Sequence, residues 1–171
     1  MKKVLLLSAV FFFQTAIASG VYQTPEAFLQ KTFSNELPPV STIWLDQEKK
    51  KVISGFLQHS PTFIRVKYWQ QGPKTAWILH EVGKSKPITV GIVIEKSKIQ
   101  QLKVLTFRES RGWEVKHDFF TQQFDNISLN EKLQLSSSVD GISGATLSVR
   151  ALKKVARIAL YLEQQTTLGD E

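Results

Sequence analysis

Four strand-like segments in the middle of the chain limit its fold more strongly than any other feature. Residues 63–69 alternate between two sets of side chains, and three further runs of strand-forming residues follow at 75–82, 88–95 and 99–107. Only short turns rich in Gly, Pro, Lys or Ser separate these runs. Parallel strands need a long crossover connection, so strands joined by short turns must pair antiparallel. The sequence therefore predicts an antiparallel sheet of about four strands.

Helices are predicted before and after these strands. Thr24-Pro25 indicates a helix start with Thr24 as N-cap, and residues 45–57 fit a second helix. A short helix is expected near 117–124. The clearest helix covers 147–164, where apolar residues recur every three or four positions. We therefore expect an α+β fold in which helices flank the sheet and an amphipathic helix ends the domain.

The first 18 residues have the organisation of an export signal. A basic start at Lys2 and Lys3 precedes an apolar run from Val4 to Phe13, and Ala16-Ile17-Ala18 has the pattern of a cleavage site. The apolar run is shorter than a typical membrane span, although an uncleaved anchor is the alternative interpretation. We therefore expect a signal peptide over residues 1–18 and a periplasmic or otherwise exported mature protein.

The mature chain is basic and contains no cysteine. Removal of Lys2 and Lys3 lowers the formal charge from +7 to +5. In an exported protein this charge favours an anionic membrane surface or an acidic protein partner, and not nucleic acid. The absence of Cys excludes disulfides, thiolate metal sites, c-type haem attachment and Cys lipidation. Any redox role must therefore depend on a bound organic cofactor or on a metal held by His.

Residues 140–148 lie immediately before and at the start of the predicted C-terminal helix. Gly144 and Ala145 are small, so a bulky group can reach the hydroxyl of Thr146. A helix N-terminus also offers unpaired backbone N–H groups and a partial positive charge, which favour a phosphate. The alternative interpretation is structural: Ser143 caps the helix, and Thr146 is an ordinary residue of its first turn.

This segment, Asp-Gly-Ile-Ser-Gly-Ala-Thr-Leu-Ser, resembles the flavinylation motif of the FMN-binding domain family. That motif is written roughly as Asp-x-x-Ser/Thr-Gly-Ala-Thr-x-Ser/Thr, and the Thr of its Gly-Ala-Thr triplet carries FMN through a phosphoester bond. The resemblance implies covalent FMN on Thr146. It also implies that Asp140 assists a flavin transferase, which uses FAD and Mg²⁺. The other residues of the expected FMN-binding segment are Gly141, Ser143, Gly144, Ala145 and Ser148.

Two upstream segments extend the resemblance. Residues 109–115 look like the family's loop bearing Glu and Gly between the sheet and the motif, and residues 119–124 look like its Phe-x-x-x-Gln-Phe segment. The residues that the resemblance implies for lining the flavin ring are Glu109, Arg111, Gly112 and Gln123. The alternatives are a solvated loop for the charged pair and a helix-surface position for Gln123. Trp113 and Phe119 either stack near the ring or belong to the core.

The resemblance covers about residues 75–162, so we assign residues 75–164 to an FMN-binding domain. Residues 19–74 would form the N-terminal helices and first strand of the same domain, and residues 165–171 a C-terminal tail. The order of segments is similar to the flavin subunits of sodium-pumping NADH:quinone reductase and of Rnf-type electron-transport complexes. This chain shows no convincing permanent membrane helix, and it reads Glu-Ser-Arg-Gly where theirs tends to read Glu-Thr-Pro-Gly. A free-standing exported relative fits better.

The function implied by the resemblance is extracytoplasmic electron transfer with a membrane or periplasmic redox partner, such as a quinol-linked reductase or a cytochrome. An electron-transfer flavoprotein is favoured over a stand-alone enzyme. The alternatives are a non-redox periplasmic binding or adaptor module, and a flavin-dependent reductase of a small substrate. No catalytic or metal-binding set is predicted, because His59, His80 and His117 are far apart in the sequence. Residues 141–145 also depart from a Gly-x-Ser-x-Gly nucleophile elbow at their last position.

Overall fold

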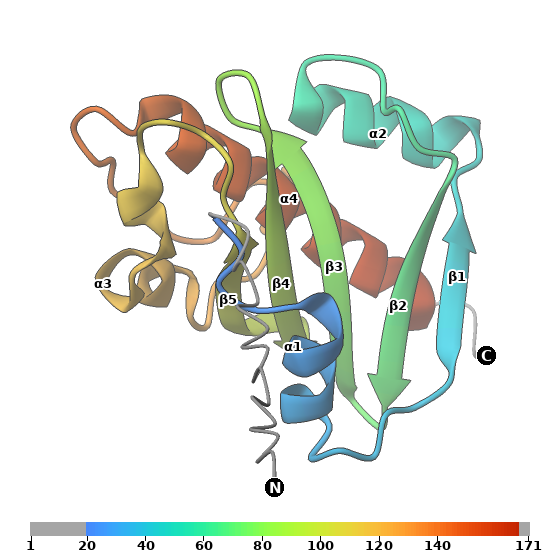
Figure 1. Cartoon of the computed structure of the whole chain (residues 1–171). Coiled ribbons are helices and arrows are strands. Elements are labelled where there is room, and N and C mark those ends of the chain that lie inside the picture. Colours follow the sequence, from blue (N-terminus) through green and yellow to red (C-terminus); the bar gives the residue numbers. More distant parts are fainter. Residues whose placement is uncertain (1–19, 168–171) are drawn as a thin grey trace, which may run out of the picture.

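The computed structural model describes residues 20–167, which contain one five-stranded antiparallel sheet and four α-helices. The predicted signal peptide, residues 1–18, lies outside the described residues, as do residues 168–171. Each strand of the sheet neighbours the next one in the sequence. Helices cover both faces of the sheet (Figure 1). The predicted α+β fold, with an antiparallel sheet flanked by helices, is therefore confirmed.

The predicted strands and helices correspond to observed elements, with differences at their ends. The strands are β1 Val40–Trp44, β2 Arg65–Gln71, β3 Lys74–Val82, β4 Pro87–Glu95 and β5 Lys98–Thr106. The helices are α1 Pro25–Thr32, α2 Gln47–Leu57, α3 Asp118–Thr121 and α4 Thr146–Thr167, with 3-10 turns at Trp113–Lys116 and Gln122–Phe124. Thr24 caps α1, since its hydroxyl accepts the N–H of Ala27 at 3.1 Å. The helix α4 continues past Gln164 into the first residues of the predicted tail.

The strand that the sequence analysis did not predict is β1, at the edge of the sheet. It pairs with β2 from Val40↔Trp69 to Trp44↔Arg65. The guanidinium of Arg65 lies 5.4 Å from the ring centroid of Trp44. The five residues of β1 contain no apolar run, and alternate residues are exposed. Pairing with β2 therefore fixes this segment as a strand, which makes the sheet one strand wider than expected.

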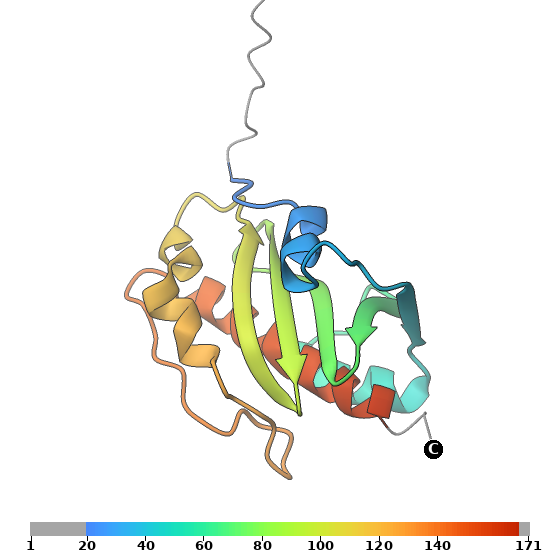
Figure 2. The ribbon, with the colours of Figure 1, turned by 90° about the horizontal axis from the view of Figure 1, so that it is seen from below.

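The structure has two hydrophobic cores. They lie on opposite faces of the sheet, one on the side of α4 and the other on the side of α1 (Figure 2). The larger core lies between the sheet and the helices α2 and α4, and it includes Trp77, Ile92 and Leu152. The smaller core lies under α1 and consists of Phe28, Leu29, Phe33, Ala76, Val93 and Leu105. A β-carbon at Gly91 would lie 2.7 Å from the Phe28 ring, so a glycine in β4 lets α1 pack directly on the sheet.

The helix α4 is 22 residues long and is buried on most of its surface. Each fully buried Val, Ile or Leu side chain stabilises such packing by about 1.5–3 kcal/mol. Lys154 Nζ also donates to Glu81 Oε1 of β3 at 2.9 Å. Arg157 Nε donates to the backbone oxygen of Leu133 at 3.0 Å. Apolar packing and these two polar contacts together fix where α4 presents its N-terminus.

The backbone just after the predicted cleavage site runs beside the end of β5. The N–H of Phe107 donates to Gly20 O at 2.7 Å, and the N–H of Tyr22 donates to Leu105 O at 2.9 Å. Gly20 has φ +103°, and a β-carbon there would lie 2.0 Å from Phe107 O. The segment is therefore held next to the loop that follows β5. Among the helices of residues 20–167, none is both long and apolar enough to cross a membrane.

Candidate functional site

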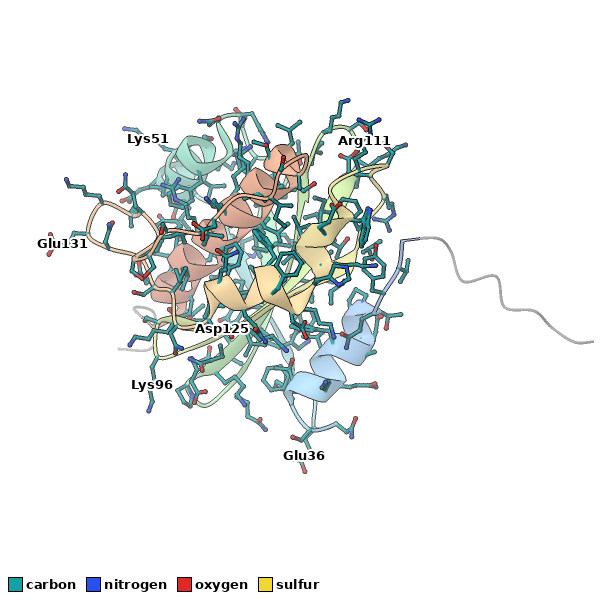
Figure 3. All side chains as sticks on the ribbon, turned by 90° about the vertical axis from the view of Figure 1, so that its left-hand side faces the viewer. Glu36, Lys51, Lys96, Arg111, Asp125 and Glu131 are labelled. Carbon is teal, nitrogen blue, oxygen red and sulfur yellow. The ribbon has the colours of Figure 1, made fainter. Side chains whose placement is uncertain are left out.

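Three segments that are distant in the sequence meet at the start of α4 and enclose a cavity of about 540 Å³. The hairpin between β3 and β4 contributes Lys84, and the loop after β5 contributes residues 109–111. The start of α4 and the turn before it contribute residues 144–148. Arg111 is labelled at this end of the molecule in Figure 3. Thr146, the predicted attachment residue, is among the lining residues.

Glu109 ties the loop after β5 to the tip of the β3–β4 hairpin. Its Oε1 accepts hydrogen bonds from the backbone N–H groups of Lys84, Ser85 and Lys86 at 2.5, 2.6 and 2.9 Å. Its Oε2 accepts the Ser85 hydroxyl at 3.1 Å. Burial raises the pKa of Glu109, but the hydrogen bonds from Lys86, Ser85 and Lys84 outweigh burial and bring the pKa below its usual value. Glu109 is therefore a charged anchor in the cavity wall.

Gly112 brings the same loop against the first turn of α4. Its φ is +84°, a conformation that favours glycine. A β-carbon here would lie 2.6 Å from Ser148 Oγ and 3.4 Å from Ala145 Cα. Gly112 is buried and is not part of the cavity lining. The structure thus places Gly112 at the contact between this loop and α4. Its predicted role at the flavin ring stays a prediction.

A tight turn leads the chain into α4. The N–H of Ala145 donates to Ile142 O at 2.9 Å, and Gly144 has φ +82°. This sign of φ is required at the third position of a type II turn, where glycine is strongly preferred. Ala145 is buried, whereas Thr146, the first residue of α4, is exposed at the cavity. The backbone therefore presents the Thr146 side chain to solvent within the cavity.

The start of α4 adds hydrogen-bond donors to the cavity. The first N–H groups of a helix have no acceptor within the helix. Ala145 directly precedes the helix and has no side-chain oxygen with which to accept them, while Ser143 lies further upstream. Lys84 and Arg111 contribute cationic side chains to the same lining. Backbone donors, two cations and a hydroxyl form a set that suits a phosphate group.

Gln123 forms a hydrogen bond with the first residue of the predicted motif. Its Oε1 accepts the backbone N–H of Asp140 at 2.7 Å. Gln123 is partly buried, whereas Asp140, Gly141 and Ser143 are exposed. None of these four residues belongs to the lining of the cavity. The structure therefore connects Gln123 to the motif through a hydrogen bond.

The cavity brings together six of the residues that were predicted to bind FMN. They are Glu109, Arg111, Gly144, Ala145, Thr146 and Ser148.

Three lining residues were not predicted, namely Lys84, Ser110 and Leu147. Ser110 and Leu147 are sequence neighbours of predicted residues. The sequence indicated a turn around Lys84 but gave no indication of what that turn packs against. The partner is Glu109, whose hydrogen bond to Lys84 spans 25 residues of sequence.

Exposed aromatic side chains follow the loop after β5. Trp113 is 46% exposed and Phe119 is 63% exposed. The His117 ring lies between them, with centroid distances of 5.4 Å to Trp113 and 6.1 Å to Phe119. Lys116 Nζ lies 4.1 Å from the ring centroid of Tyr22. We call Tyr22, Trp113, His117 and Phe119 the aromatic patch, and it belongs to the surface and not to the core.

His117 belongs to the aromatic patch, whereas His59 and His80 both line a second cavity. His59 Nε2 lies 3.5 Å from Glu81 Oε1, and His80 Nδ1 lies 3.0 Å from Thr89 Oγ1. Burial lowers the pKa of His80, and the charge of Arg108 lowers it further. Within residues 20–167, no three side chains of the kinds that bind metals are grouped to hold an ion.

Residues 83–161 match the FMN-binding domain family. The matched segment begins at the β3–β4 hairpin and ends within α4, so it includes all three segments that enclose the cavity. No curated protein matches the chain. The family match supports a flavin-binding protein whose cofactor is FMN. The cavity residues fit this cofactor chemically, because their donors and cations suit the phosphate at its end.

Proposed function

We propose that this chain, which carries a domain of the FMN-binding domain family, holds FMN through a phosphoester bond to Thr146 and transfers electrons outside the cytoplasm. One observation carries the proposal. Thr146 is an exposed residue at the first position of a 22-residue helix, within the cavity that the three segments enclose. It also occupies the attachment position of the motif that residues 140–148 resemble.

The cavity can hold a phosphate at Thr146 without burying it. Residues 146–148, whose N–H groups have no acceptor within the helix, line the same cavity as Lys84 and Arg111. A helix N-terminus stabilises an exposed anion by about 0.3–1 kcal/mol. A tenfold change in affinity requires about 1.4 kcal/mol. Because such contacts are weak, a covalent bond is what would keep the cofactor on an exported protein that is exposed to dilution.

The attachment step requires a flavin transferase and FAD as the donor. Thr146 Oγ1 forms a bond to the phosphorus of the FMN half of FAD. The bond between that phosphorus and the bridging oxygen of the pyrophosphate breaks, so AMP leaves with the bridging oxygen and the hydroxyl proton passes to solvent. No atom changes oxidation state. Mg²⁺ held by the transferase offsets the pyrophosphate charge, and Asp140 is exposed where the transferase can reach it.

When bound, FMN supplies one- and two-electron redox chemistry. The chain contributes position and surroundings. Each of the three segments carries exposed cations, namely Lys84, Lys86, Arg108, Arg111 and Arg150, and Lys84 and Arg111 line the cavity itself. The aromatic patch follows the same loop and offers an apolar contact surface. A membrane or periplasmic redox protein with an acidic docking surface fits this arrangement, because opposite charges speed encounter.

We also place the protein in the periplasm or another exported location, on the basis of the signal-like residues 1–18. The formal charge falls from +7 to +5 when Lys2 and Lys3 are removed, and this remaining charge supports association with an anionic membrane surface. Such an association would keep the flavin near membrane-bound electron donors or acceptors.

The proposal is tested by exporting the protein from cells that contain a flavin transferase. The purified protein should be yellow, and its flavin fluorescence should survive denaturing electrophoresis. Thr146→Val keeps a β-branched side chain but has no hydroxyl, so it should be colourless. Ser143→Ala and Ser148→Ala are matched controls that should keep the label. Labelling of Thr146→Val at the level of the unmodified sequence would contradict the attachment site.

A further inference from the structure

A second cavity, of about 510 Å³, lies where β2 and β3 separate. The pairing of these two strands ends at Tyr68↔Trp77. Beyond that pair, β2 continues beside β1 to Arg65, while β3 continues beside β4 to Val82. The two strands diverge toward α2 in Figure 1. We call this cavity the slot.

The slot is separate from the cavity at Thr146. The two cavities have no lining residue in common. On α4, Ser148 lines the first cavity and Val155 lines the slot. Because a helix rises 1.5 Å per residue, these positions lie about 10 Å apart along the helix axis. A ligand in the slot would therefore not occupy the proposed flavin site.

The interior of the slot is apolar. Its walls come from β2, β3, the start of β4, α4, the end of α2 and the loop after α2. The apolar side chains of its lining include Leu57, Phe63, Val66, Leu79, Val155 and Ile158. Cavities of about 300–1,000 Å³ with mostly apolar walls are typical of small-molecule sites. A hydrocarbon chain or a ring would be shielded from water in this interior.

The mouth of the slot is cationic. Side chains of a strand alternate between the two faces of a sheet. In β2, Arg65 and Lys67 therefore point to the face opposite Val66, and in β3 His80 points to the face opposite Leu79. All three polar residues are exposed and line the slot. Because burial lowers the pKa of His80, the positive charge of the mouth at neutral pH comes from Arg65 and Lys67.

Glu81 is the acidic residue of the slot lining, and it does not cancel this charge. Its side chain is 8% exposed and accepts a hydrogen bond from Lys154 Nζ at 2.9 Å. His59 Nε2 lies 3.5 Å from the same oxygen. Lys154 thus neutralises Glu81 on the α4 side of the sheet. The two cations at the mouth have no acidic counterpart in the lining.

From this arrangement we infer that the slot binds a small amphipathic anion, with its carboxylate at Arg65 and Lys67 and its hydrocarbon body between β2 and β3. A cationic amphiphile would meet like charges at the mouth. An uncharged alcohol would fill the interior but would lose the charge-assisted hydrogen bonds. The size of the slot favours a small molecule over an extended peptide or a second copy of this chain. The inference goes beyond the proposed flavin function and does not depend on it.

Titration calorimetry of the mature protein with octanoate, octan-1-ol and octylamine tests this inference. Octanoate should bind saturably with one molecule per chain, about tenfold more tightly than the other two probes. Arg65→Gln/Lys67→Gln should weaken octanoate binding about tenfold and leave octan-1-ol binding unchanged. The matched control Lys31→Gln/Lys51→Gln removes the same charge from exposed positions on α1 and α2 and should leave octanoate binding unchanged. All four cations are exposed or partnered only by a ring, so both variants should fold.

Amide chemical shifts in NMR spectra locate the bound octanoate. The shifts should change around Val66, Leu79 and Val155 and should leave Thr146 unaffected. Absence of saturable octanoate binding would overturn the inference, as would binding of octylamine that is equal or tighter. Shift changes confined to the cavity at Thr146, or chain dimerisation through β2 and β3 in place of octanoate binding, would also overturn it.

Discussion

A β-carbon at Gly112 would lie 2.6 Å from the hydroxyl oxygen of Ser148, so this pair of residues sets how closely the loop after β5 approaches α4. The same loop is held on its other side by Glu109, which accepts three backbone N–H groups of the β3–β4 hairpin. The cavity wall therefore depends on one close packing contact and on one set of charge-assisted hydrogen bonds near the surface.

Replacement of Gly112 by Ala should lower the free energy of unfolding by about 2–4 kcal/mol, since it adds backbone strain at positive φ to a steric overlap with Ser148. Urea unfolding measures the change. Gly144→Ala is a matched control, because Gly144 also has positive φ but has open space around its β-carbon position. Gly144→Ala should lower the free energy of unfolding by only about 1–2 kcal/mol. If both variants lose the same free energy of unfolding, the contact between Gly112 and Ser148 does not contribute to stability.

Replacement of Glu109 by Gln should destabilise the protein by about 1 kcal/mol at neutral pH, because a charged acceptor of backbone N–H groups is lost close to solvent. The folded-state pKa of Glu109 lies below its usual value. Its stabilisation is therefore complete above the unfolded-state pKa of about 4.3 and is lost as the pH falls through the lower folded-state pKa. The two proteins should converge in stability at acidic pH. A constant difference down to the lowest pH would contradict the role of the charge.

The cations of the flavin cavity should speed electron exchange with anionic mediators. In flavinylated Lys84→Gln/Arg111→Gln, stopped-flow reduction by reduced anthraquinone disulfonate should slow severalfold at low ionic strength. The difference should vanish near 1 M salt, where the screening length is about 3 Å. Reduction by the methyl viologen radical cation should not slow. Lys51→Gln, on α2 (Figure 3), is the control and should behave like the unmodified protein. Equal slowing with both mediators would exclude electrostatic steering.

Breaking the ion pair between Lys154 and Glu81 should destabilise the protein far more than removing both charges together. Its side chains are 16% and 8% exposed. Lys154→Met leaves the Glu81 charge without its closest partner and should cost about 3 kcal/mol in urea unfolding. Glu81→Leu/Lys154→Met removes both charges and should recover most of that loss. A double variant as unstable as the single one would mean that packing, and not charge, explains the effect.

Local patterns in the sequence were sufficient for most of the fold. The spacing of apolar residues along 147–164 and the short turns after 63–69 predicted α4 and the antiparallel order of four strands. The edge strand β1 could not be predicted, because Val40–Trp44 becomes a strand only through its pairing with β2. The separation of β2 from β3 beyond Tyr68↔Trp77 likewise depends on packing that no local pattern records.

The candidate site was predictable where its residues are consecutive and not where they meet through the fold. The motif placed Thr146 at the start of a helix behind two small residues, as observed. Lys84 was missed because its contact with Glu109 requires the β3–β4 hairpin to lie on the loop after β5. Gln123 accepts the N–H of Asp140, a contact between segments 17 residues apart that no local pattern indicates. Its predicted place at the flavin ring stays a prediction.

The central claim is a single bond from the Thr146 side chain to the phosphate of FMN. Intact-mass spectrometry of mature protein purified from cells that possess a flavin transferase tests it most directly. We expect a chain without residues 1–18 whose mass is increased by one FMN less one water, and no such increase for Thr146→Val. A mass equal to that of the bare polypeptide, or an increase that persists in Thr146→Val, would contradict the account.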